Sequence, residues 1–306
     1  LVGEVRGAEA FDLLQALNTG HLGSLSTIHA NSAEQAFTRL AHCVLTANVG
    51  LPHRSTREAI ALAIHLVVHI ARVGSHRRVT ELVAVDVNVP RGLRVAYVPG
   101  VGDNVAPTLA QLGLAVTVLS PDSVALADLS RFRTVVLGPR VYEANPGLTA
   151  ANGRLLDWAR TGGTLVVQYQ QDIARRGLAP LPLTLAQRAE RVTEEDAPVR
   201  LLDPAHPLLS TPNRIGPQDF AGWVQERGLY MPSTFDAGWT PLVETADAGM
   251  TPNRGGILVA PLGGGGTYVL TTLAFFRQLP AGNAGAARLF INLLAASGEG
   301  RGGIAP

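Results

Sequence analysis

The sequence predicts an α/β protein built from two parts, and three observations lead to this prediction. After Gly92, strand and helix patterns alternate as they do in a doubly wound parallel sheet. Before Pro90 the pattern differs, because capped helices are followed by a β-hairpin. Seven of the eight histidines also precede Pro90. We therefore expect two domains, residues 1–88 and residues 92–297, that meet near Pro90.

Composition narrows the class of protein. The chain has 306 residues, of which 46% are hydrophobic and 16% charged, enough apolar residues for a sizeable core. The net charge of +1 gives no bulk field that would favour nucleic acid or an anionic membrane. We see no membrane-spanning run and no signal peptide, and the single Cys43 fits a reducing compartment, so we expect a cytoplasmic protein without direct membrane insertion.

The first part is predicted to hold three helices and a hairpin. Two of the helices begin with capping boxes, in which a serine is followed three residues later by Gln35 or Glu58. Glycines end the first helix and turn the hairpin. The predicted elements are helices from Ala8 to Thr19, after Ser32 and near Ser55, and strands from His65 to Ile70 and from Arg78 to Val87.

The stretch from Gly3 to Asn31 carries most of the chemistry visible in the sequence. Glu4 stands at the end of an apparent strand, and Arg6 follows two residues later. A polar loop after the first helix contains His21, Ser24, Thr27 and His29. A carboxylate at a strand end, an arginine and a loop of this composition are what a nucleotide γ-phosphate and its Mg²⁺ require. The structural alternative is a buried strand and a capped helix followed by an ordinary loop.

This stretch resembles the traffic ATPases of type II and type IV secretion and of Tad/Flp pilus assembly. The resemblance rests on GEVRGAEAFDLLQALNTGH and GSLSTIHANS and continues to Thr80, so it covers residues 1–86. It implies a truncated P-loop-ATPase-like segment that once used ATP and Mg²⁺, and partners among ATPase-like subunits or a secretion or pilus machine. Since Leu1 lies inside the motif, we expect an N-terminal part to be missing. The residue roles that it implies are Glu4 as the Walker B carboxylate, His29 as the histidine-box residue near the γ-phosphate, and Arg6, His21, Ser24 and Thr27 as further nucleotide contacts.

One compositional fact limits this resemblance, because the chain contains no lysine. A P-loop has the form G-x-x-x-x-G-K-[ST], and its lysine reaches the β- and γ-phosphates. The motif is therefore absent from the chain. We expect the segment to be incomplete and the chain alone not to hydrolyse ATP at a useful rate.

The second part alternates between predicted strands and helices. In such a sheet, ligands bind beyond the carboxyl ends of the strands. A long proline-rich insertion, residues 177–238, is expected to be irregular and to cover these ends. The predicted strands are Leu93–Val98, Ala115–Leu119, Thr134–Leu137, Thr164–Val167, Gly256–Pro261 and Thr267–Thr272, and the predicted helices are Val105–Leu112, Leu148–Arg160 and Ala284–Ala296.

Residues 92–297 resemble the flavodoxin-like, class I glutamine amidotransferase-like domain attached to some PIG-L-type deacetylases. The resemblance rests on GLRVAYVPGVGDN, LLDWARTGGTLVVQYQ, DPAHPLLSTPNRIGPQDFAGWVQERGLY and LAFFRQLPAG. The amidotransferase family implies a cysteine nucleophile on a strand-to-helix elbow, with a His–Glu pair. No cysteine other than Cys43 exists here, and the expected elbow reads Val167-Gln168-Tyr169-Gln170, which excludes thiol chemistry. We therefore interpret the domain as a non-catalytic binding or scaffold domain.

The strand ends of this part offer donors, acceptors and an aromatic face but no activated nucleophile. We predict a concave pocket there, lined by Arg140, Tyr142 and Gln168 with His206 nearby, that takes a polar small molecule or carbohydrate. Two alternatives remain open. One is a carbohydrate- or peptide-binding accessory domain of a PIG-L-type deacetylase, and the other is a metal-assisted hydrolase that uses Asp203, His206 and Asp219.

Overall fold

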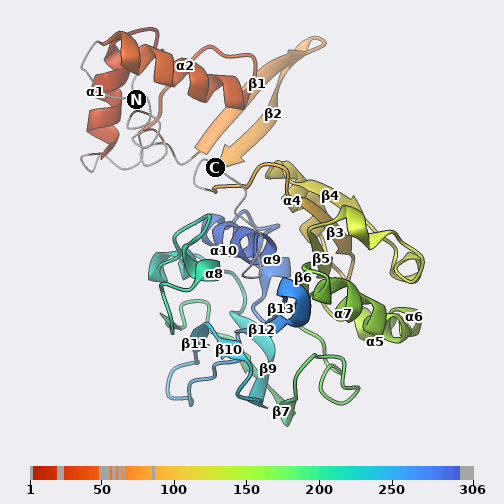
Figure 1. The fold of residues 1–306 in the computed structure, drawn as a ribbon. Coiled ribbons are helices and arrows are strands. Elements are labelled where there is room, and N and C mark those ends of the chain that lie inside the picture. The colour runs from red at the N-terminus through yellow and green to blue at the C-terminus, as the bar shows by residue number, and fades with distance from the viewer. Residues whose placement is uncertain are drawn as a thin grey trace. The chain divides into compact units, whose positions relative to one another are not determined.

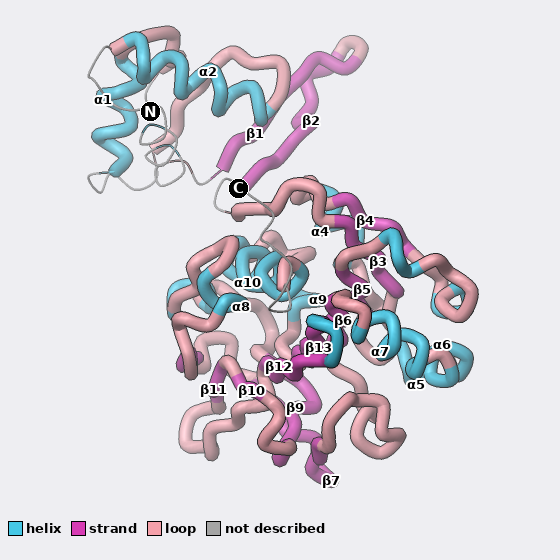
Figure 2. The backbone as a smooth tube through the Cα atoms, viewed as in Figure 1, coloured by secondary structure: helices cyan, strands magenta, loops and turns pink. Residues whose placement is uncertain are grey.

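The computed structural model describes residues 3–18, 24–47, 56, 60, 64, 66–84 and 87–296 (Figure 1). The chain divides into two compact units, unit 1 from Leu1 to Asp86 and unit 2 from Val87 to Pro306. Figure 2 shows both helices and strands in each unit. No helix in the described part of the chain is both long and apolar enough to cross a bilayer.

Unit 1 consists of two packed helices and a hairpin. Helix α1 (Glu9–Asn18) and helix α2 (Ala33–Thr46) bury a small apolar core that includes Leu14 and Val44. The predicted cap of α2 is present, because Ser32 Oγ accepts a hydrogen bond from the Gln35 amide at 3.1 Å. The helix predicted near Ser55 lies mostly outside the described residues.

The hairpin of unit 1 is antiparallel, and both of its strands reach closer to the turn than predicted. Strand β1 (Leu66–Val73) pairs with strand β2 (His76–Ala84) through a turn at Gly74, whose φ is 63°. A positive φ of this size is the conformation that glycine adopts without steric cost, so the sequence signal for the turn was sound.

Unit 2 is built on a seven-stranded sheet with the order β10-β12-β13-β6-β5-β3-β4. The segment from β13 to β4 is parallel, and β12 and β10 extend it antiparallel at one edge. This confirms the predicted doubly wound α/β fold. The strands are β3 (Arg94–Val98), β4 (Ala115–Val118), β5 (Thr134–Leu137), β6 (Thr164–Gln168), β10 (Thr240–Pro241), β12 (Ile257–Leu262) and β13 (Gly266–Thr271).

Helices cover both faces of the sheet, and each face has its own apolar core (Figure 1). Helices α4 (Val105–Gln111) and α10 (Ala284–Leu294), with the short α9 (Phe275–Gln278), pack on one face. On the other face lie α5 (Val141–Ala144), α6 (Pro146–Ala150) and α7 (Asn152–Arg160). The single helix predicted from Leu148 to Arg160 is therefore wrong in detail, because α6 ends at Ala150 and a new helix begins at Asn152.

The insertion of residues 177–238 is more regular than predicted. Strand β7 (Leu183–Val192) pairs antiparallel with β9 (Gly228–Phe235), and β8 (Val199–Leu201) pairs antiparallel with β11 (Val243–Thr245). Helix α8 (Pro207–Ser210) and the 3₁₀ turn η3 (Pro217–Phe220) complete it. The register of β7 shifts at three places, and these bulges break the alternation by which a strand is recognised in sequence.

Candidate functional site

In unit 1 a short parallel bridge brings the two halves of the predicted motif together. Glu4 and Thr27 form an isolated parallel bridge, in which the Val5 amide donates to the Thr27 carbonyl at 2.8 Å. Ser26 Oγ adds a hydrogen bond to the Gly3 carbonyl at 3.1 Å. Because His29 follows Thr27 by two residues, this bridge sets its imidazole beside the Glu4 carboxylate.

The Glu4 carboxylate contacts two of the predicted site residues. Its Oε1 lies 3.1 Å from His29 Nε2, and its Oε2 accepts from Arg6 Nη2 at 2.5 Å. The hydrogen bond from Arg6, together with the charges of Arg6, His29 and Arg39, holds the pKa of Glu4 below its ordinary value of 4.5 although partial burial opposes this. Glu4 is therefore ionised at neutral pH.

The start of α1 fixes the position of Arg6. The Glu9 carboxylate accepts from the backbone amides of Arg6, at 2.6 Å, and Gly7, at 2.9 Å. These bonds satisfy amides at the start of the helix, which have no carbonyl partner within it, and they lower the pKa of Glu9. The turn that carries Arg6 is thereby tied to the first turn of the helix.

The site is open to a ligand, because the side chains of His29 and Arg6 are 80% and 74% exposed and that of Glu4 is 23% exposed. Ser24 and Thr27 are also exposed, whereas His21 lies outside the described residues. The structure therefore brings Glu4, Arg6 and His29 together. An ionised carboxylate beside an imidazole suits the Mg²⁺ and γ-phosphate side of a nucleotide, and the lysine that would hold the β- and γ-phosphates is not in the chain.

In unit 2 the predicted pocket is not formed by the three residues predicted to line it. Tyr142 is fully buried in the core on the α7 face of the sheet, where its hydroxyl donates to Asn152 Oδ1 at 2.6 Å. Gln168 is also fully buried, and its Nε2 donates at 2.8 Å to the hydroxyl of Tyr97, which belongs to the core on the opposite face. The structure therefore does not bring the Tyr142 and Gln168 side chains together, because they contact cores on opposite faces of the sheet.

Arg140 occupies an unusual backbone position at the end of β5. Its φ is 56°, in the left-handed region that costs a non-glycine residue about 1 kcal/mol or more. Its amide donates to the Tyr169 carbonyl at 3.0 Å, which couples the loops that follow β5 and β6. The strained residue therefore follows β5, whereas the elbow was predicted after β6.

Around Arg140 lie aromatic rings and buried polar atoms that lack partners. Tyr169 stacks on Tyr230, with ring centroids 5.7 Å apart, and contacts Phe276 at 5.5 Å. Arg277 lies over the Phe276 ring and pairs with Glu226 at 2.6 Å. Within the described residues, three buried side-chain atoms at this edge have no hydrogen-bond partner: Arg140 Nε, Glu143 Oε2 and Gln168 Oε1.

Sequence reasoning missed Tyr230, Phe276 and Arg277 as members of this edge. Tyr230 comes from the insertion and has a positive φ of 55°, and the other two come from the segment after β13. Their only signal was the aromatic pair in LAFFRQLPAG, which does not reveal where the chain returns to the sheet.

The glycines of the turn after β3 have a structural role. A Cβ added to Gly100 would lie 2.1 Å from the Pro139 carbonyl oxygen, and one added to Gly138 would lie 2.2 Å from the Gly100 nitrogen. The two loops therefore approach so closely that neither position tolerates a side chain. This packing accounts for the glycine at position 100 without a bound nucleotide.

The three residues of the metal-hydrolase alternative are each engaged separately. Asp219 accepts from the Gly216 amide at 2.7 Å and from Arg288 Nε at 2.7 Å. His206 Nδ1 accepts from the Leu208 amide at 3.2 Å, and burial lowers its pKa, whereas Asp203 accepts from the Ala205 amide at 3.1 Å. In the described part of the chain no three His, Cys, Asp or Glu side chains are grouped so that they could hold a metal.

Comparison with known proteins supports the first resemblance directly. Residues 1–96 match the family described as Type II/IV secretion system protein. The conjugal transfer protein TrbB of Rhizobium radiobacter is 42% identical over 86 residues, which is 28% of this chain and 25% of that protein. The type IV secretion system protein VirB11 of Brucella suis biovar 1 is 36% identical over 102 residues, 32% of this chain and 28% of that protein. The predicted resemblance of the first part to secretion proteins is confirmed.

The match is confined to a part of each protein, since the chain spans about a quarter of the length of the curated relatives it matches. Among solved structures, a chain in the structure of PurLQS from Thermotoga maritima is similar to this chain. The match covers 66% of this chain and 97% of that chain, with 12% identity and a TM-score of 0.44. This likeness carries no information on activity.

Proposed function

We propose that unit 1 supplies the carboxylate–histidine part of a nucleotide site of the secretion-ATPase type, and that the chain does not turn over ATP by itself. The observation that carries this proposal is the 3.1 Å contact between the Glu4 carboxylate and the His29 imidazole, which the Glu4–Thr27 bridge maintains. The secretion relatives match in this same segment.

Each residue has a role that follows from its contacts. Glu4 is ionised and partly exposed, so it can face Mg²⁺ or orient a water molecule. Arg6 keeps Glu4 ionised and holds its second oxygen. His29, exposed and next to Glu4, can donate to the γ-phosphate and relay its presence to the carboxylate. Bound Mg-ATP would supply the phosphoryl group, and a lysine-bearing phosphate loop would have to come from outside residues 1–306. The partners of such a segment would be ATPase-like subunits or another component of a secretion machine.

The proposal can be tested by NMR on the full chain labelled at histidine. A non-hydrolysable ATP analogue with Mg²⁺ at about millimolar concentration should shift the ring signals of His29, because millimolar affinity is what a site lacking its main phosphate contacts can provide. ADP with Mg²⁺ is the control, since it lacks the γ-phosphate. Glu4→Gln should abolish the response to the ATP analogue. Equal shifts from ADP, or shifts that persist in Glu4→Gln, would contradict the proposal.

For unit 2, we propose recognition of a polar, hydroxyl-rich ligand such as a carbohydrate at the edge that carries Arg140. The observation that favours it is the Tyr169–Tyr230 stack at this edge, together with Arg140 Nε and Glu143 Oε2, which have no hydrogen-bond partner among the described residues. Buried polar atoms without partners are uncommon, and aromatic faces beside them suit a sugar ring. Glycan-array binding that Tyr230→Ala abolishes would support this role, whereas binding that Tyr230→Ala leaves unchanged would place the ligand elsewhere.

A further inference from the structure

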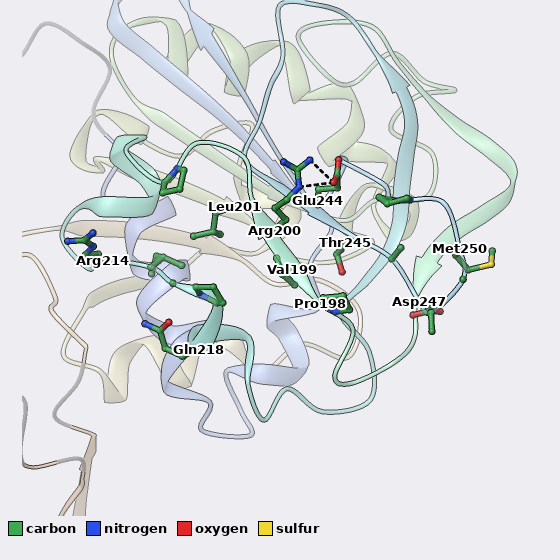
Figure 3. Close-up of a pocket in the computed structure, with 18 residues that line it drawn as sticks. Pro198, Val199, Arg200, Leu201, Arg214, Gln218, Glu244, Thr245, Asp247 and Met250 are labelled. Carbon is green, nitrogen blue, oxygen red and sulfur yellow. Dashed lines mark hydrogen bonds and ion pairs between the residues drawn. The ribbon is translucent and has the colours of Figure 1, made fainter. Parts of the chain in front are cut away.

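A cavity of about 1140 Å³ lies in unit 2, and none of its lining residues belongs to the Arg140 edge (Figure 3). It is lined by strands β8 and β11, by the segment of residues 214–218 and by the loop of residues 246–252. Its volume exceeds the range of roughly 300–1,000 Å³ that is typical of sites for single small ligands. The cavity therefore has room for a ligand longer than one metabolite.

Strand β8 exposes an unpaired backbone edge at this cavity. Thr245 uses both its amide and its carbonyl to bond Asn253, each at 3.0 Å, so its backbone turns away from Val199, its partner residue in β8. Along an antiparallel pair of strands, hydrogen-bonded residue pairs alternate with pairs that are not hydrogen-bonded. The ladder hydrogen bonds therefore belong to the pair of Arg200 and Glu244. The amides and carbonyls of Val199 and Leu201 consequently point to the outer edge, where no described residue bonds them.

An unpaired strand edge is a template for a further strand. Both Val199 and Leu201 also line the cavity, so the unpaired groups lie at its wall. The three residues of β8 span roughly 10 Å at 3.3 Å per residue, which matches a peptide of about three to five residues. Thr245 Oγ1 adds one more buried polar atom without a partner among the residues that line the cavity.

The rest of the lining favours an extended chain over a sugar. It is largely aliphatic and rich in proline, with Pro198, Pro204, Ile215 and Pro217 among its members, and it contains no aromatic residue. Aliphatic walls suit the side chains of an extended peptide, whereas a sugar ring would lack a stacking platform.

Among the described residues that line the cavity, one cation has no charged partner within the described part of the chain. Glu244 accepts from both Arg200 and Arg254, and Asp247 accepts from the amides of Thr193 and Glu194. Arg214, at one end of the lining residues in Figure 3, has no ion pair or hydrogen bond with any described residue. An exposed guanidinium without a partner is suited to a carboxylate.

We propose that this cavity binds a short extended peptide that carries a carboxylate, and that the peptide adds as a strand to the outer edge of β8. The amides and carbonyls of Val199 and Leu201 form its main-chain hydrogen bonds, and Arg214 pairs with its carboxylate. The aliphatic walls receive alternate side chains, as is usual when a peptide extends a sheet.

The first experiment is a selection from a phage-displayed library of random eight-residue peptides on the full-length chain. We expect enrichment of peptides that alternate aliphatic residues and carry an Asp, a Glu or a free C-terminal carboxylate. The affinity of the best peptide is then measured by fluorescence anisotropy, alongside a version that is N-methylated at alternate residues. Removing the donors of one or two main-chain hydrogen bonds, each contributing about 1 kcal/mol, should weaken binding about tenfold.

Variants of the protein locate the peptide. Leu201→Pro removes an outward-facing amide without removing a ladder bond and should weaken binding about fivefold, the effect of one hydrogen bond, whereas Leu201→Val keeps the amide and should bind normally. Arg214→Gln should weaken binding about threefold and reduce its salt dependence, whereas Arg188→Gln, at an exposed position outside the cavity lining, should not.

Several results would overturn the proposal. These are the absence of any enriched peptide, equal affinity of the N-methylated peptide, or self-association of the chain that the same variants abolish, which would make a second copy the occupant of the edge. If Leu201→Pro fails to fold by circular dichroism, the N-methylated peptide and Arg214→Gln still decide between these outcomes.

Discussion

The backbone amide of Asn88 donates to the side-chain carbonyl of Asn213 at 2.6 Å, and the Asn213 carboxamide donates back to the Asn88 carbonyl at 3.0 Å. This reciprocal pair joins positions 125 residues apart in the sequence. Asn213 is 5% exposed and also contacts Asn292, so it lies within a buried amide network. Asn88, placed by sequence in the first domain, is therefore bonded to unit 2.

Removing the Asn213 side chain should destabilise unit 2. Asn213→Ala removes the hydrogen bonds that its side chain makes with the Asn88 amide, the Asn88 carbonyl and Asn292 Oδ1, and each lost bond costs about 0.5–1.5 kcal/mol. We expect a loss of about 2–3 kcal/mol in the free energy of unfolding, measured with urea. Asn104→Ala is the matched control, since Asn104 is exposed and makes no capping bond through its side chain, and it should change stability by less than about 0.5 kcal/mol.

The same pair predicts where unit 2 begins as a folding unit. That the two units fold separately remains a prediction. A fragment of residues 87–306 keeps Asn88, whereas a fragment of residues 92–306 loses it. The longer fragment should unfold at the higher urea concentration and resist limited proteolysis longer. Identical midpoints for the two fragments would show that the Asn88–Asn213 pair contributes nothing to the stability of unit 2.

Arg140 offers a test of backbone strain. Its φ of 56° is favourable for glycine and unfavourable for other residues. Arg140→Gly and Arg140→Ala both remove the guanidinium, but only the first relieves the backbone, so the glycine variant should be the more stable by about 1 kcal/mol. Thermal unfolding of the two variants measures the difference. Greater stability of the alanine variant would mean that this conformation is not strained.

The Glu244 carboxylate should make the stability of unit 2 depend on pH. The hydrogen bonds that it accepts from Arg254 and Arg200 hold its pKa below the ordinary value of 4.5. A lowered pKa in the folded state stabilises the protein above pH 4.5, and the contribution disappears as the pH falls through the lowered value. In Arg254→Gln, ¹³C NMR should show the Glu244 titration moved upward, with that of Glu9 unchanged. An unmoved Glu244 titration would mean that Arg254 does not set its charge.

The pattern of strands and helices in unit 2 could be predicted because each parallel strand is short and rich in apolar, β-branched residues. Thr134–Leu137 was predicted with both boundaries correct, three other strands differ by one residue at one end, and β12 and β13 are each shifted by one residue at both ends. The break between α6 and α7 was missed because apolar side chains continue through it at helical spacing. Strands β7 and β9 were missed because bulges shift their register.

The candidate sites divide in the same way. The proximity of Glu4, Arg6 and His29 could be predicted because the motif is local and one short bridge brings it together, whereas their roles stay a prediction. The pocket of Arg140, Tyr142 and Gln168 could not, since a residue near a strand end can turn toward either core, and sequence does not say which. The free edge of β8 was also invisible, because it depends on a pairing with a strand more than 40 residues away.

The most direct test of the central claim is a phosphate-release assay on the purified full chain with Mg-ATP. The claim is that Glu4 and His29 are arranged for a γ-phosphate that this chain, having no lysine, cannot hold for reaction. We predict that release from the wild-type chain equals that from Glu4→Gln within error. A turnover of about 1 s⁻¹ is within the ordinary range of enzymes. Such a turnover, abolished by Glu4→Gln, would contradict the account.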